Sequence, residues 1–169
     1  RVNIQKGSII GYVTKNIYKE KTFRFKQLLS EEKKYKYNSP KKLGELKKII
    51  QNQKKKAEKI LKKFDKKLID SFGSARSGPT YALNFGLSKY INYIFDDHPL
   101  KKNRFTSFLN QKVYPTNKIY KIKPKLLIIL AYLHSKKIIK NNKKFLYEGG
   151  NFILDFSAVK LINKKNIKK

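Results

Sequence analysis

Few side chains in this sequence could do acid–base or metal chemistry, and they do not converge. Asp96, Asp97 and His98 are adjacent, but adjacent residues seldom converge on one ion, and no further cluster of ligands accompanies them. His134 lies in an apolar segment, so we expect a core or boundary histidine with satisfied hydrogen bonds. The absence of Cys excludes thiolate zinc sites and Cys nucleophiles. The sequence therefore predicts no catalytic residue, no metal site, no cofactor and no enzymatic activity.

The segment GSARSGP, residues 73–79, is the one loop that could bind an anion. It precedes a predicted helix, so its backbone N–H groups could hold a phosphate while Arg76 donates to it. The alternative is a plain connector between two helices, which is the interpretation we favour. The GxxxxGK[ST] spacing of a P-loop is absent.

Charge is the strongest signal in the composition. The chain of 169 residues has 42 Lys and Arg against 11 Asp and Glu, a formal net charge of +31. Such a charge repels itself, so an external polyanion should neutralise it, and nucleic acid or an anionic membrane are the candidates. Part of the Lys excess reflects an A+T-rich coding bias, but that bias does not explain why acidic residues are so few.

Residues 40–72 give the clearest local pattern, a long basic helix. Apolar side chains recur at helical spacing on one stripe, Ser39 can serve as the N-cap before Pro40, and Gly73 can end the helix. Its other face is almost all lysine. This face could follow an RNA backbone or could simply be solvated, and its single sign of charge favours RNA.

The remaining elements complete an α+β fold, with a long basic helix and a helical middle between small antiparallel strand regions at both ends. Residues 1–29 are rich in strand formers, with Thr22–Lys26 alternating, and residues 143–162 suggest a β-hairpin. Further helices are expected at 80–95 and 125–140. The predicted division is an N-terminal strand region and loop (1–39), the basic helix (40–72), a helical core with a hairpin (73–162) and a basic tail (163–169).

Basic side chains along the whole chain are the candidate RNA ligands, and aromatic residues among them could stack on unpaired bases, although most should be core. The candidate RNA-binding residues are Lys47, Lys54, Lys55, Lys56, Lys62, Lys63, Lys66, Arg76, Lys101, Lys102, Arg104, Lys136, Lys137, Lys140, Lys143 and Lys144. The aromatic residues are Tyr35, Tyr37, Phe105, Phe108, Tyr114 and Tyr120.

No membrane-spanning segment is expected, because the longest apolar run, Leu126 to Leu133, is far shorter than the roughly 20 residues that a transmembrane helix needs. The sequence also has no Met, even at its first position, so a targeting segment is expected to be either removed or missing from it.

Residues 127–162 resemble the S4-type RNA-binding domain. Ile138 to Lys143 (IIKNNK) matches its turn after a helix, and Gly149 to Ile153 stands where that family has a Gly-Asp, with Asn151 in place of the Asp. The whole chain resembles ribosomal proteins of mitochondria or plastids, being small, α+β and extremely basic. This resemblance implies rRNA contacts that position without reading sequence.

The sequence therefore predicts a structural constituent of an organellar ribosome. Its expected partners are rRNA and neighbouring ribosomal proteins, with no small-molecule substrate, and its expected location is the mitochondrion or a plastid. The alternative is a basic accessory subunit of an organellar membrane complex that binds anionic lipid or an acidic partner. An RNA-modifying enzyme finds no support, because no cofactor loop or acid–base constellation is recognisable.

Overall fold

A computed structural model describes residues 8–106, 109–154 and 157–167, and it confirms the α+β class. The helices are α1 (Phe23–Tyr35), α2 (Pro40–Leu61), α3 (Gly78–Asn84), α4 (Ile119–Ile122), α5 (Ser135–Asn141) and α6 (Lys143–Tyr147). The strands are β1 (Ile69–Phe72), β2 (Ile94–Asp96), β3 (Val113–Pro115), β4 (Leu126–Ile129), β5 (Asn151–Leu154) and β6 (Lys160–Ile162). Short 3-10 turns join several of them.

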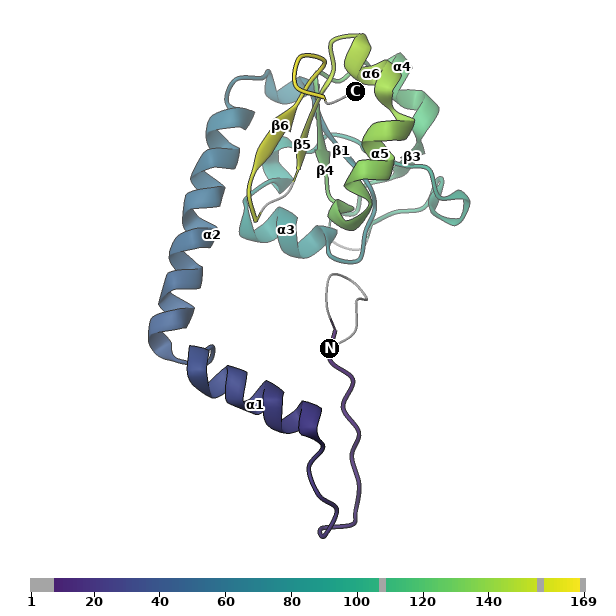
Figure 1. The fold of residues 1–169 in the computed structure, drawn as a ribbon. Helices are drawn as coiled ribbons and strands as arrows, with labels where there is room; N and C mark the ends of the chain where they lie inside the picture. Colours follow the sequence, from purple (N-terminus) through teal and green to yellow (C-terminus); the bar gives the residue numbers. More distant parts are fainter. Residues whose placement is uncertain (1–7, 107–108, 155–156, 168–169) are drawn as a thin grey trace. The chain divides into compact units, whose positions relative to one another are not determined.

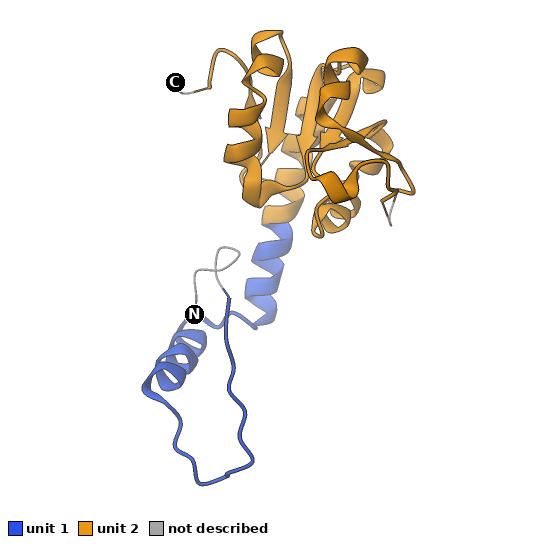
Figure 2. Ribbon diagram, turned by 90° about the vertical axis from the view of Figure 1, so that its right-hand side faces the viewer, with its two compact units in different colours: residues 1–48 blue, residues 49–169 orange. Residues whose placement is uncertain are grey.

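The chain divides into two compact units, residues 1–48 and 49–169, and the boundary falls inside α2 (Figure 2). The predicted division at residues 39, 72 and 162 stays a prediction. Among the described residues, no helix has the length and apolar character needed to cross a bilayer.

The second unit contains a single six-stranded sheet in the order β3-β2-β1-β4-β5-β6. All neighbouring pairs are parallel except β5 and β6, which are antiparallel. From β1 the chain moves outward to β2 and β3, whereas from β4 it moves to β5 and β6 on the other side. The order therefore reverses between β1 and β4, which is where open parallel sheets commonly bind ligands, at the carboxyl ends of the strands.

Alternating side chains of the central strands form two cores, one on each face of the sheet. Leu126 and Ile128 join one core, which also buries Ala57 and Leu61 of α2. Leu127 and Ile129 join the other, which is covered by α4, α5 and α6 (Figure 1). Because both faces of β4 are buried, the strand is apolar at every position, and period-two alternation is absent from its sequence.

The prediction of strands in residues 1–29 is wrong for the part that the structure describes. Residues 9–13 lie outside any helix or strand, and the alternating segment from Phe23 begins α1. The physical cause is local: the Thr22 hydroxyl accepts a hydrogen bond from the Phe25 N–H at 3.3 Å and caps the helix. Residues 1–7 lie outside the described residues.

The long helix begins at Pro40 as predicted but ends at Leu61, well before residue 72. Ile69 to Phe72 form β1 instead, and Asp65 caps the short turn between them. Only Ala57 and Leu61 of α2 are buried, whereas Leu43 and Leu46 are 56% and 51% exposed. The apolar residues of the predicted helix 40–72 are therefore divided among α2, β1 and the segment between them, and those at the start of α2 are exposed.

Two further predictions of a single helix are wrong, because each segment forms one helix and one strand. The expected helix 80–95 is α3 followed by β2, because Gly86 adopts a positive φ of 62° that ends helical structure. The expected helix 125–140 is β4 followed by α5. A short, fully apolar run fits a buried helix and a central parallel strand equally well, and here the strand forms.

The predicted C-terminal hairpin, residues 145–147 paired with 152–156, does not form, although an antiparallel pair lies in the same region. Residues 143–147 form α6, while β5 pairs with β6 through Phe152 and Ile162. Val159, in the loop before β6, donates its N–H to the Gln53 side chain at 3.0 Å, which ties this end of the sheet to α2. Residues 155–156, which the predicted hairpin included, lie outside the described residues.

Candidate active site

The loops that follow β1 and β4 meet at the carboxyl end of the sheet. Gly73, directly after β1, has a φ of 95°, and a Cβ at this position would lie closer than 3.0 Å to the Cβ of Ala131. The Leu130 N–H donates to the Phe72 carbonyl at 2.9 Å, and the Gly73 N–H donates to the Phe95 carbonyl at 2.7 Å. Only glycine satisfies both the backbone conformation and the close approach.

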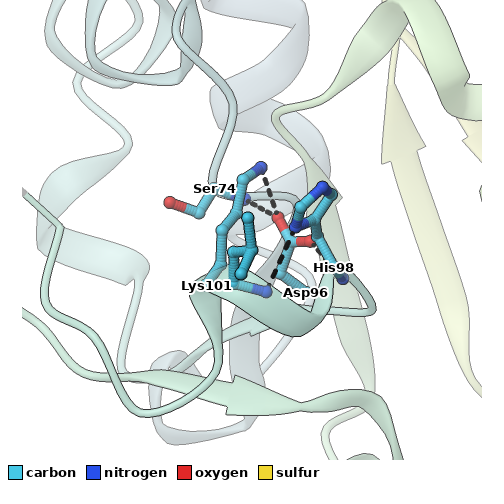
Figure 3. Close-up of polar contacts among 5 residues, drawn as sticks. Ser74, Asp96, His98 and Lys101 are labelled. Carbon is cyan, nitrogen blue, oxygen red and sulfur yellow. Dashed lines mark hydrogen bonds and ion pairs between the residues drawn. The ribbon is translucent and has the colours of Figure 1, made fainter.

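A buried carboxylate fixes the loop after β1. Asp96 ends β2 and is only 4% exposed. Its Oδ2 accepts from the Ser74 N–H at 2.7 Å and from Lys101 Nζ at 3.0 Å, and its Oδ1 accepts from the His98 N–H at 2.9 Å. Figure 3 shows Ser74, His98 and Lys101 around this carboxylate. Charge-assisted hydrogen bonds of this kind are stronger than neutral ones, so the loop is held in one place.

A cavity of about 340 Å³ opens beside this anchored loop. The loop contributes Arg76 and Pro79, the strand ends contribute Ile94 and Leu130, and the segment between β2 and β3 contributes Phe105 and Thr106. The full lining is Gly73, Ser74, Ala75, Arg76, Gly78, Pro79, Ile94, Phe105, Thr106 and Leu130. Phe105 is 66% exposed, so its ring is available to a ligand. An apolar floor with one guanidinium at the rim suits a small organic molecule that carries negative charge.

The buried Asp70 of β1 lies outside the lining of this cavity. Its Oδ1 accepts from the Tyr93 N–H at 2.9 Å, whereas its Oδ2 has no hydrogen-bond partner among the described residues. Burial raises the pKa of the Asp70 carboxyl from 3.8 to about 6, against backbone hydrogen bonds that lower it. The Asp70 carboxylate positions Tyr93, just before β2, but the burial of its charge lowers the stability of the fold.

The predicted RNA-binding residues come from several elements of the chain. Four of them lie on α2, namely Lys47, Lys54, Lys55 and Lys56, and the segment before β1 contributes Lys62, Lys63 and Lys66. Helices α5 and α6 contribute Lys136, Lys137, Lys140, Lys143 and Lys144. The buried end of α2 packs on one face of the sheet and α5 and α6 on the other. Of the rest, Arg76 lines the cavity and Lys101 pairs with Asp96, while Lys102 and Arg104 are exposed.

The two histidines are both exposed. His98 caps a 3-10 turn, its Nδ1 accepting from the Leu100 N–H at 3.3 Å, as expected of a residue at a helix end. His134, expected at a core or boundary position, ends another 3-10 turn and is exposed, so the core position is wrong. Within the described ranges no three His, Asp or Glu side chains gather as a metal site would require.

The residues of this site are recognisable in the sequence, but their connection is not. The sequence favours a connector between two helices at residues 73–79, because the apolar run before Gly73 fits a helix. A strand, a glycine-rich turn and a helix, followed about 20 residues later by an acid, is the pattern of a ligand-binding βαβ unit. Recognising Ile69–Phe72 as a strand would have linked Gly73 to Asp96.

Comparison with known proteins identifies the family. A model of the C-methyltransferase C-terminal domain matches residues 3–156, which is most of the chain. No curated protein matches the sequence.

This match overturns the functional interpretation of the sequence. The ribosomal assignment and the alternative of a membrane-complex subunit are wrong, and so is the expectation that the chain has no part in an enzyme. The cause is the weight given to the net charge of +31. Contact between the predicted lysines and RNA stays a prediction, and so does the organellar location.

Proposed function

The chain belongs to the C-methyltransferase C-terminal domain family, and we propose that it binds the methyl acceptor, a small organic molecule, in the cavity at the carboxyl end of the sheet. The observation that carries this proposal is the cavity's position where the strand order reverses, between loops that Gly73 and Asp96 hold in place.

The chemistry of carbon methylation suggests what the cavity must stabilise. A carbon atom becomes nucleophilic when it loses a proton beside a carbonyl group, and the negative charge then rests largely on the carbonyl oxygen. The Arg76 guanidinium at the cavity rim can donate to such an oxygen or to a carboxylate of the acceptor. Phe105 and the apolar floor can exclude water from the carbon skeleton.

The methyl donor does not fit the same residues. In sites for adenosine-containing cofactors, the acid at the end of the second strand accepts hydrogen bonds from ribose hydroxyls. Here the Asp96 carboxylate already accepts from two backbone N–H groups and from Lys101. A carboxylate offers about four acceptor positions, so little capacity remains for a ribose. We therefore place the donor on another part of the enzyme.

Amide NMR of the ¹⁵N-labelled chain tests the assignment. Titration with 2-oxo acids and keto sugars should include at least one compound that shifts the amides of Gly73 to Arg76, of Gly78 and of Thr106, because these residues line the cavity. Titration with an adenosyl sulfonium methyl donor should leave them in place. Shifts of these amides by the donor, with none by any carbonyl compound, would reverse the assignment of acceptor and donor.

A further inference from the structure

A second cavity lies at the amino-terminal end of the strands, opposite the candidate active site. It has a volume of about 280 Å³ and is lined by Ile119, Tyr120, Lys123, Pro124, Lys125, Phe145, Glu148 and Gly150. Lys125 precedes β4, whereas Leu130 of the first cavity follows it. A strand of this length spans about 13 Å, so the two cavities are separate sites.

Two aromatic rings wall this second cavity. Phe145 is fixed by edge contact with Phe152, their ring centroids 5.2 Å apart. Gly150 leaves room for the Phe145 ring, because a Cβ there would lie closer than 3.0 Å to it. Tyr120, on α4, has the Lys144 ammonium 4.9 Å from its ring centroid. The cavity therefore has aromatic side chains in its lining, against which the ring of a ligand can pack.

The charge around the rings is positive. Lys123 and Lys125 line the cavity together with one carboxylate, Glu148, and Lys144 lies over the Tyr120 ring. Lys144 pairs with Glu148 at 3.7 Å, whereas Lys123 and Lys125 have no ion pair in the described part of the chain. Lys123 moreover adopts a left-handed conformation with a φ of 56°, which non-glycine residues seldom adopt and which aims its backbone away from the preceding helix.

We propose that this second cavity binds a small aromatic anion, namely an aryl carboxylate, at a site distinct from the acceptor site. The ring would lie between Tyr120 and Phe145, and the carboxylate would meet Lys123 and Lys125. A volume just below the roughly 300–1,000 Å³ of most ligand sites limits the ligand to one ring with a short substituent.

Fluorine NMR with para-trifluoromethylbenzoate as the probe tests this proposal on the whole chain. Saturable binding is expected, and trifluoroacetate, which has the charge without the ring, should bind at least about tenfold more weakly. The double variant K123E/K125E should weaken binding of the benzoate probe at least about tenfold. K136E/K137E changes the net charge equally on exposed residues of α5, and it should change the affinity less than about twofold.

Two outcomes would overturn the proposal. Equal loss in both double variants would mean attraction to the overall charge, and equal affinity for the two probes would mean that the rings have no part. If K123E/K125E does not fold, Tyr120→Leu serves instead: it keeps both lysines, and the benzoate probe should lose its advantage over trifluoroacetate. The readout is binding alone, so it is independent of the function proposed for the first cavity.

Discussion

The backbone N–H of Ser74 donates to Oδ2 of Asp96 over 2.7 Å and so ties the loop after β1 to the end of β2. The same oxygen accepts from Lys101 Nζ, which brings the segment after β2 into the same network. Three chain segments that line or border the first cavity are therefore positioned by one carboxylate.

Replacement of Asp96 by Ala should destabilise the protein by about 2–4 kcal/mol, because it leaves the Ser74 and His98 N–H groups and Lys101 without their acceptor. Urea unfolding measures the change, and hydrogen exchange at the Ser74 amide should accelerate. Lys101→Met removes only the partly exposed partner and should cost about 1 kcal/mol or less. Similar losses in the two variants would contradict the central place given to the carboxylate.

Gly73→Ala should destabilise the fold by about 2–4 kcal/mol, since the new Cβ meets Ala131 and the backbone keeps a positive φ. Gly44→Ala is the matched control. Nothing lies within 4 Å of a Cβ at Gly44, which is in α2, so this change should be neutral or stabilise by up to about 1 kcal/mol. Thermal unfolding of both variants measures the contrast, and a tolerated Gly73→Ala would refute the close approach of the two loops.

The raised pKa of the Asp70 carboxyl should make the stability of the protein depend on pH. Its pKa of about 6 in the folded protein is above the ordinary 3.8, so the folded state holds this proton more tightly than the unfolded state. The contribution of Asp70 is therefore most favourable below pH 3.8 and is lost as the pH rises through about 6. Relative to Asp70→Asn, the wild type should gain on the order of 2 kcal/mol between neutral pH and the acid limit.

Urea unfolding of the wild type and of Asp70→Asn across this range isolates the effect, because all other titrating groups are common to both. A stability difference that stays constant with pH would mean that the Asp70 carboxyl is ionised in the folded protein without penalty.

Local signals predicted the parts of the fold that depend on a few neighbouring residues. Ser39 and Pro40 marked the start of α2 correctly, and its apolar spacing as far as Leu61 identified a helix. Leu126 to Ile129 could not be assigned from the sequence, because only the burial of both faces of β4 distinguishes this strand from a buried helix. Burial on both faces is a property of the complete sheet.

The site was hidden for a related reason. Ser74 and Asp96 are 22 residues apart, and nothing in either residue type indicates their hydrogen bond. Parallel pairing of β1 with β2 brings them together, and neither strand was recognised. The lysines, by contrast, are conspicuous in the sequence, but of the predicted ligands only Arg76 lines the first cavity.

Steady-state kinetics of carbon methylation test the central claim most directly, with Arg76→Ala compared against Lys137→Ala, an exposed control on α5. Loss of the guanidinium at the cavity rim should raise the KM for the acceptor by about 10–100-fold, as expected for a lost charge-assisted hydrogen bond. The KM for the methyl donor should stay within about twofold, and Lys137→Ala should change neither. A rise in the KM for the donor with an unchanged KM for the acceptor would contradict the assignment of this cavity to the acceptor.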